Sequence, residues 1–328
     1  MSIYVCPKDV SLSDYMAFLS HQESQSIHGV GKWSAEVLRW AAGAEEETGD
    51  ALPWSKAQDF KLRPEELTIW AGYRGHHKSF VTGMVAAWLA RDVRIGIASF
   101  EMPPKDTIAR MIRQSAGCHP SVDYCMGWIE AMDPMIRIYD DYSAMTPEVV
   151  MAVIHHFAHD LGCGHVFIDS LMKCGIPTDD YTKQKAFVNE LTIAAKRYKI
   201  HIHLVAHLRK AQHKGGGLPN ADDVAGGSDI TNLAHNVCIV WNDKEVMELR
   251  EKQRMGAPIS PEESEKLEQR THIIKLDKQR NGPDQICWSF WLDPKSMQFT
   301  PDRSMRRLEW IPQGKTMSTL ASDTWSAN

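Results

Sequence analysis

The segment from Leu67 to Ser79, LTIWAGYRGHHKS, constrains the fold of this chain more than any other. It begins as an apolar run, breaks at Gly72 and ends in Lys-Ser, which predicts a strand, a loop and the start of a helix. Its spacing approaches G-x-x-x-x-G-K-[ST], where loop N–H groups surround phosphates, the lysine contacts the β- and γ-phosphates and the hydroxyl contacts Mg²⁺. Gly72, Lys78 and Ser79 fit that pattern. The segment therefore predicts a site for a nucleoside triphosphate with Mg²⁺.

The second glycine of the pattern is replaced by His77. A residue with a Cβ adopts left-handed torsions only at a cost, so the replacement leaves open a loop that binds nucleotide with little turnover. Gly75 eases the turn two residues earlier, and the backbone N–H groups of Gly75, His76 and His77 remain as phosphate donors. An ordinary strand, turn and helix explains the same residues without a ligand.

Composition narrows the class of protein. A chain of 328 residues with 43% hydrophobic content is long enough to bury a sizeable core. No stretch approaches the roughly 20 apolar residues of a membrane span, and the first ten residues lack the pattern of a signal peptide, so we expect a cytoplasmic protein with no membrane partner. Seven scattered cysteines indicate reduced thiols. The net charge of −5 excludes a generally basic surface, so any nucleic-acid contact has to be local.

The order of apolar and amphipathic segments predicts one α/β domain with a mostly parallel central sheet, flanked by helices. We place an N-terminal arm or linker at residues 1–58, the domain at 59–313 and a polar tail at 314–328. Strands are expected at Leu67–Ala71, Arg94–Ser99, Ile136–Tyr139, His165–Asp169, Ile200–Ala206 and Val237–Trp241, with helices at Ser79–Arg91, Lys105–Ala116, Pro147–Leu161 and Tyr181–Tyr198. A charged insertion at Lys244–Arg270 precedes a β-hairpin, Thr271–Asp277 with Gln285–Leu292, whose turn contains Asn-Gly.

Three further strands end in polar groups suited to phosphate chemistry. Asp169 ends HVFID, where a carboxylate can hold Mg²⁺, and Glu101 follows IGIASF, where a carboxylate can orient the attacking water. His207 ends the strand IHIHLVAH, where a polar group can sense loss of the γ-phosphate. Each residue also has an ordinary explanation: a helix cap for Asp169, a glutamate at a helix start for Glu101 and a partly buried histidine for His207.

The segments LRPEELTIWAGYRGHHKS, SFEMP, FIDSL, VAHLRK, GGSDI and KQRNGP, in this order, resemble the RecA-like motor domain of hexameric replicative helicases of the DnaB and Twinkle type. The resemblance spans roughly Leu52 to Pro301. It implies a RecA-like P-loop NTPase core that uses ATP and Mg²⁺. Lys78 and Ser79 would bind phosphate and Mg²⁺, Asp169 would be the Walker B acid, and Glu101 and His207 would act as the catalytic carboxylate and the γ-phosphate sensor.

In the same family the KQR turn reaches the nucleotide of the neighbouring subunit. The resemblance therefore implies that Lys278 and Arg280 act in trans, Arg280 as an arginine finger. Without the other segments, KQRNGP is typical of an exposed hairpin tip with two solvated cations.

The resemblance places single-stranded DNA against loops after Asp169 and after His207. The second loop carries the DNA-binding candidates Arg209, Lys210, Lys214, Gly226, Gly227 and Ser228. Their charges and N–H groups suit a sequence-independent grip on phosphates, whereas a flexible surface loop is the plain alternative.

Together these features predict an ATP-dependent DNA helicase. By resemblance it assembles as a ring, with a homo-hexamer expected, translocates 5′ to 3′ and works with a separate primase or loader in a bacterial or viral replication context. Two alternatives remain: a RecA-type recombination or loading ATPase, and a nucleotide-binding regulatory module with little turnover.

Overall fold

The structure is a computed structural model that describes residues 27–43, 48–141, 145–209, 218–268, 270–282 and 285–302, with Ser13 and Met16 as isolated positions. The chain divides into two compact units, Met1–Glu47 and Thr48–Asn328. The first contains a short 3₁₀ turn, Val30–Trp33, and helix α2, Ser34–Ala41. The polar tail expected at 314–328 lies outside the described residues.

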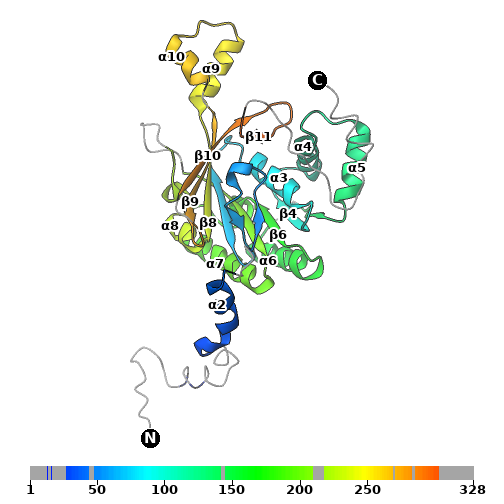
Figure 1. Cartoon of the computed structure of the whole chain (residues 1–328), viewed down its shortest axis with the longest axis vertical. Coiled ribbons are helices and arrows are strands. Elements are labelled where there is room, and N and C mark those ends of the chain that lie inside the picture. The colour runs from blue at the N-terminus through cyan, green and yellow to red at the C-terminus, as the bar shows by residue number, and fades with distance from the viewer. Residues whose placement is uncertain are drawn as a thin grey trace. The chain divides into compact units, whose positions relative to one another are not determined.

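The second unit is built on a nine-stranded sheet in the order β11-β10-β9-β8-β3-β7-β6-β4-β5 (Figure 1). Its strands are β3 Leu67–Gly72, β4 Ile95–Ser99, β5 Ile136–Ile138, β6 His165–Asp169, β7 His201–His207, β8 Asn236–Asn242, β9 His272–Gln279, β10 Ile286–Leu292 and β11 Phe299–Thr300. The six strands β8, β3, β7, β6, β4 and β5 run parallel to one another. On the other side of β8, strands β9, β10 and β11 follow, and each is antiparallel to its neighbour. The predicted α/β architecture with a C-terminal hairpin is confirmed.

Helices cover both faces of the sheet, as parallel strands require. Helices α3 (Lys78–Leu89), α4 (Pro104–Ala116) and α5 (Val122–Met132) share one apolar core, and α6 (Pro147–His155), α7 (Tyr181–Tyr198) and α8 (Ser228–Leu233) share the other. Strand β3 shows how the cores are separated. Trp70 belongs to the first, whereas Ile69 and Ala71 belong to the second, because successive side chains point to opposite faces.

The compact unit begins earlier than residue 59, where the sequence placed the start of the domain. Leu52, Trp54 and Phe60 are buried in its core. The indole N–H of Trp54 donates to the carbonyl of Phe299, 2.6 Å away, and a small two-stranded sheet, β1 (Asp50–Ala51) with β2 (Lys61–Leu62), completes this region. The segment before β3 therefore packs against the edge of the main sheet that is formed by β11.

The charged insertion forms two helices, α9 (Lys244–Arg254) and α10 (Pro261–Leu267), between β8 and β9. Val246, Leu249 and Leu267 make a small core of their own, and the ammonium of Lys252 lies 2.8 Å from Oε1 of Glu263. The insertion expected at Lys244–Arg270 is thus a helical pair between two strands of the sheet.

The parallel arrangement brings the carboxyl ends of β3, β4, β6 and β7 to one edge of the sheet, which is where α/β folds bind ligands. None of the helices in the described part of the chain combines the length and apolar character needed to cross a bilayer. The six cysteines in that part are free thiols.

Candidate nucleotide site

The loop between β3 and α3 curls through two left-handed residues. Gly75 has φ of 80° and His77 has φ of 63°. His77 is the N-cap of α3, which begins at Lys78. The first N–H groups of a helix have no acceptor within it, so the loop presents donors and a positive helix end to an anion.

Gly72 is fixed by close packing at the end of β3. A Cβ added there would lie 2.5 Å from the carbonyl oxygen of Val240 on β8 and 3.0 Å from Cγ of Lys78. Only glycine lets the strand, its neighbour and the lysine stem approach this closely. Close packing alone therefore explains why residue 72, the first glycine of the loop pattern, is a glycine.

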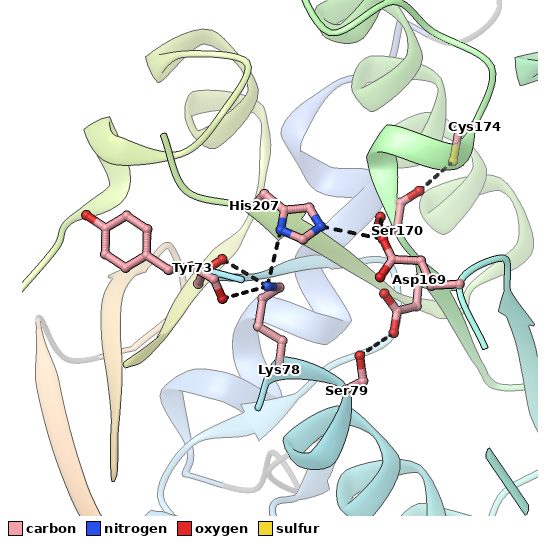
Figure 2. Close-up of polar contacts among 9 residues, drawn as sticks. Tyr73, Lys78, Ser79, Asp169, Ser170, Cys174 and His207 are labelled. Carbon is pink, nitrogen blue, oxygen red and sulfur yellow. Dashed lines mark hydrogen bonds and ion pairs between the residues drawn. The ribbon is translucent and has the colours of Figure 1, made fainter. Parts of the chain in front are cut away.

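The ammonium of Lys78 lies under the loop, and the residue is 7% exposed. It donates to the carbonyls of Gly72 and Tyr73, at 2.9 and 3.1 Å, and lies 3.4 Å from Nδ1 of His207 (Figure 2). Burial lowers the pKa of Lys78, while the carboxylates of Asp169 and Glu101 raise it. The structure thus holds the lysine where a phosphate bound by the loop would meet it.

Ser79 and Asp169 face each other across the start of α3 and the end of β6. The Ser79 hydroxyl donates to Oδ2 of Asp169 at 2.7 Å (Figure 2). Burial raises the pKa of Asp169, and the hydrogen bond from Ser79 opposes that shift. A hydroxyl and a carboxylate at this spacing supply the oxygen ligands that Mg²⁺ prefers, so these two residues fit the ion and would hold it.

Glu101 is connected to the ends of two neighbouring strands. Its Oε1 accepts a 2.7 Å hydrogen bond from the hydroxyl of Ser170 and lies 3.5 Å from Nε2 of His207. The interactions with His207 and Ser170 outweigh burial and lower the pKa of Glu101 to about 2. The carboxylate is therefore ionised at neutral pH. Ser170 was not among the predicted site residues, although its place directly after Asp169 was the available signal.

The two loop histidines turn their side chains toward β8 and β9. Nδ1 of His76 accepts the backbone N–H of Asn242 at 3.0 Å, and the ring is buried. Nδ1 of His77 lies 3.0 Å from Nε2 of His272, the first residue of β9. Burial lowers the pKa of His77 and of His272, the latter to about 3, so both rings are neutral at pH 7. Each histidine ties the loop to the sheet.

A cavity of about 1110 Å³ opens beside these groups. Tyr73, Glu101 and His207 line it on the loop side. Lys173 and Ala225, which lie in or near the loops predicted to contact DNA, also line it. The phosphate loop and the predicted DNA loops therefore share one cavity.

Arg110 on α4 is a further basic group that the sequence did not mark. With Ser79 and Asp169 it lines a small cavity of about 30 Å³, and its guanidinium lies 4.5 Å from the Phe80 ring centroid. Burial lowers the pKa of Arg110 and Asp169 raises it. One arginine within an amphipathic helix carries no pattern that would identify it as a site residue.

The sequence matches the AAA domain family over residues 39–213, more than half of the chain. The chain belongs to the AAA domain family. No curated protein matches it.

Two solved structures share the fold of this AAA domain. One, described as an ATPase domain, superimposes with a TM-score of 0.65 at 14% identity, covering 84% of this chain and 99% of that one. A DnaB-like replicative helicase, solved with attention to its interactions with primase, gives a TM-score of 0.63 at 14% identity, covering 88% and 71%. At this level of identity the likeness establishes the fold alone, which this chain shares with both structures.

Lys278 and Arg280 lie at the opposite end of the strands from the phosphate loop of the AAA domain. The backbone N–H of Arg280 donates to the carbonyl of His235 at 3.0 Å, and Nδ1 of His235 accepts the N–H of Leu67, the first residue of β3. The six residues of β3 separate this end from Gly72, roughly 20 Å at about 3.3 Å per residue. Neither cation is placed to reach the nucleotide site of its own chain.

Both cations contact the last carbonyls of α8. Lys278 Nζ donates to Thr231 and Asn232 at 2.8 and 2.9 Å, and Arg280 donates to Asn232 at 2.6 Å. Burial and the nearby Arg280 lower the pKa of Lys278 to about 8. These side chains are not the freely solvated pair of a plain hairpin tip.

The predicted DNA-binding residues fall partly outside the described structure: Lys210 and Lys214 are not among the described residues. Gly226 and Gly227 have positive φ, 106° and 86°, and lead into α8 at Ser228. The exposed Arg209 has its guanidinium 6.0 Å from the Tyr181 ring centroid. The N–H of Ala225 donates to the carbonyl of His207 at 2.8 Å, so the glycine loop is hydrogen-bonded to the strand end that carries the predicted sensor.

Proposed function

We propose that this chain is the motor of an ATP-dependent DNA helicase that assembles as a ring, a homo-hexamer, and translocates on single-stranded DNA. Its ligands are ATP and Mg²⁺, and its nucleotide sites lie between subunits. The likeness in fold to a DnaB-like helicase and to a solved ATPase domain supports the proposal, as does membership of the AAA domain family.

One observation carries the proposal. Lys78, Ser79, Asp169, Glu101 and His207 come from four separate segments and form one connected set at one edge of the sheet. At the opposite end of the strands Arg280 is held away from that set. The set has its own lysine, hydroxyl and carboxylates, with Arg110 beside Ser79 and Asp169, and we infer that Arg280 of a second copy completes it.

Each residue has a defined task in this proposal. The loop N–H groups and Lys78 bind the phosphates and offset their charge, while Ser79 and Asp169 hold Mg²⁺, which supplies charge neutralisation when bound. Because its pKa is about 2, Glu101 stays ionised and orients the attacking water rather than holding a proton beforehand. Arg280 of the adjacent copy stabilises charge on the phosphoryl group.

Coupling to DNA follows from the backbone hydrogen bond between His207 and Ala225. A change in the contacts of His207 when the γ-phosphate leaves would be passed to the loop Gly226-Gly227-Ser228. We assign the grip on DNA to this loop, with Arg209, Lys210 and Lys214. The directional preference, 5′ to 3′, and a primase or loader as partner are part of the same proposal, and the helicase studied with primase supports the latter.

The test is ATP hydrolysis by the purified chain with and without single-stranded DNA, with oligomer mass measured on the same samples and strand displacement as the second assay. The proposal predicts DNA-stimulated turnover in a ring-sized oligomer and displacement of the complementary strand. Nucleotide binding with no turnover in either condition would overturn it in favour of a regulatory module. DNA-stimulated turnover in open filaments without displacement would overturn it in favour of a recombinase-type ATPase.

A further inference from the structure

We propose that His272 is a positioning residue for the phosphate loop: it holds His77 in the left-handed conformation that a glycine would otherwise supply. The inference rests on the proposed function, because it assigns His77 and His272 jointly to shaping the nucleotide site. A side-chain contact between the two histidines would stabilise the left-handed backbone conformation that a glycine adopts without such a contact.

The backbone of His77 shows the need for such a contact. Its φ of 63° and ψ of 27° lie in the left-handed region, and it caps α3 immediately before Lys78. Residues other than glycine leave this region unless their surroundings hold them there. A shift at His77 would move the N–H groups that start α3, and with them the ammonium of Lys78.

The ring of His77 is held on two sides. Its centroid lies 4.9 Å from that of Phe80 on the first turn of α3, and its Nδ1 lies 3.0 Å from Nε2 of His272. The contact with Phe80 is local and moves with the helix. The contact with His272 reaches across 195 positions of sequence and fixes the loop to the sheet.

His272 is itself immobilised. It is fully buried, its Nδ1 lies 2.7 Å from the hydroxyl of Thr271, and its ring meets the Phe299 ring edge-on at 5.0 Å. Only its Nε2 side is directed to the loop. Because the ring is buried and its Nδ1 already contacts Thr271, its Nε2 is held in one position, where it can bond His77.

The direction of the His77 side chain leaves the phosphate cradle open. Among the described residues, Tyr73, Arg74 and His76 line the cavity shared with Glu101 and His207, whereas His77 does not. The imidazole is directed toward His272 and Phe80 and does not line this cavity. This explains how a histidine is accommodated where the loop pattern has glycine.

A double-mutant cycle tests the pairing. The variants are His272→Phe, which keeps a ring of similar size beside Phe299 but removes the hydrogen bond, His77→Gly, which restores the loop pattern, and the two combined. His272→Gln is the conservative control, because its amide can still bond the His77 ring. For each we would measure unfolding in denaturant without nucleotide, then affinity for a fluorescent ATP analogue with Mg²⁺.

The pairing predicts that His272→Phe weakens nucleotide affinity about fivefold when His77 is present, the effect of one lost hydrogen bond, and leaves it unchanged in the His77→Gly background. His272→Gln should restore most of the loss. The unfolding cycle should show a coupling of the same sign. Equal effects of His272→Phe in both backgrounds would overturn the pairing, since the residue would then act independently of His77.

The two proposals fail separately in this experiment. No nucleotide binding by any variant, with coupling still present in unfolding, would contradict the proposed nucleotide site and leave the His77–His272 pairing supported. Zero coupling in the unfolding cycle would overturn the pairing whatever the nucleotide result.

Discussion

The side-chain amide of Asn281 donates a 2.7 Å hydrogen bond to Oε1 of Glu66, which joins the turn that carries Arg280 to the residue directly before β3. Glu66 is 2% exposed, and its second oxygen accepts from Asn236 at 2.9 Å. The turn proposed to act in trans is therefore anchored on the strand that leads to the phosphate loop of the same chain.

Replacing Asn281 by alanine should loosen this turn and lower ATP turnover of the oligomer severalfold, because Arg280 would no longer be held in one position. Nucleotide affinity should stay within about twofold of the unmodified chain, since the site that binds it lies at the other end of β3. Steady-state kinetics with a separate binding titration measure the two effects. A loss of affinity equal to the loss of turnover would contradict the anchoring role.

Gly72→Ala should destabilise the chain by about 1–3 kcal/mol through overpacking, since its Cβ would lie 2.5 Å from the Val240 carbonyl oxygen. Gly75→Ala is the matched control. It has no atom within 4 Å of an added Cβ and carries only the cost of its left-handed torsion, about 1 kcal/mol. Denaturant unfolding compares them, and a Gly72→Ala variant as stable as Gly75→Ala would refute the steric assignment.

Glu101→Gln should reduce ATP turnover by about 10²- to 10⁴-fold while leaving nucleotide binding within about twofold, because the amide keeps the shape but loses the charge that orients water. Ser170→Ala removes only the 2.7 Å hydrogen bond to Glu101 and should cost about tenfold or less. Single-turnover kinetics separate chemistry from binding. Turnover preserved in Glu101→Gln would show that another group positions the water.

Stability should fall as pH drops below about 6.5, the ordinary pKa of histidine. His201 and His203 are fully buried, and desolvation lowers the pKa of each well below that value. Below about pH 6.5 the unfolded chain binds protons that the folded chain does not, so the free energy of unfolding falls by up to about 1.4 kcal/mol per pH unit for each histidine. Above that pH both states are neutral and the contribution is flat.

Unfolding in denaturant between about pH 5 and 8 measures this slope. His203→Phe, which keeps a ring beside Phe167, should reduce it, because the variant loses one buried proton acceptor. A slope unchanged in this variant would show that His203 does not contribute.

The sequence predicted the parts of the fold and site that depend on local pattern. Apolar runs marked the parallel strands, and because such strands end at one edge, Lys78, Asp169, Glu101 and His207 could be expected together. Helix α5 was missed. Its buried residues Tyr124, Trp128, Ala131 and Met132 form one stripe, but the exposed residues Val122, Met126 and Ile129 are apolar as well, so the stripe does not stand out in the sequence.

Contacts between residues that are far apart in the sequence could not be predicted from the local sequence pattern. His77 meets His272 across 195 positions, and Glu66 meets Asn281 across 215. Each partner alone is typical of an ordinary buried or turn residue, and only the folded sheet brings them together. The contacts of Lys278 and Arg280 with the end of α8 are of the same kind.

The central claim, a nucleotide site completed between two copies, is tested most directly by mixing subunits. Lys78→Ala and Arg280→Ala chains would be prepared separately, combined in equal amounts and assayed for ATP hydrolysis with single-stranded DNA. Each alone should be inactive. The mixture should recover roughly a quarter of the normal rate, the fraction of interfaces that pair an intact Lys78 with an intact Arg280 of the neighbour. A mixture as inactive as its components would contradict the account.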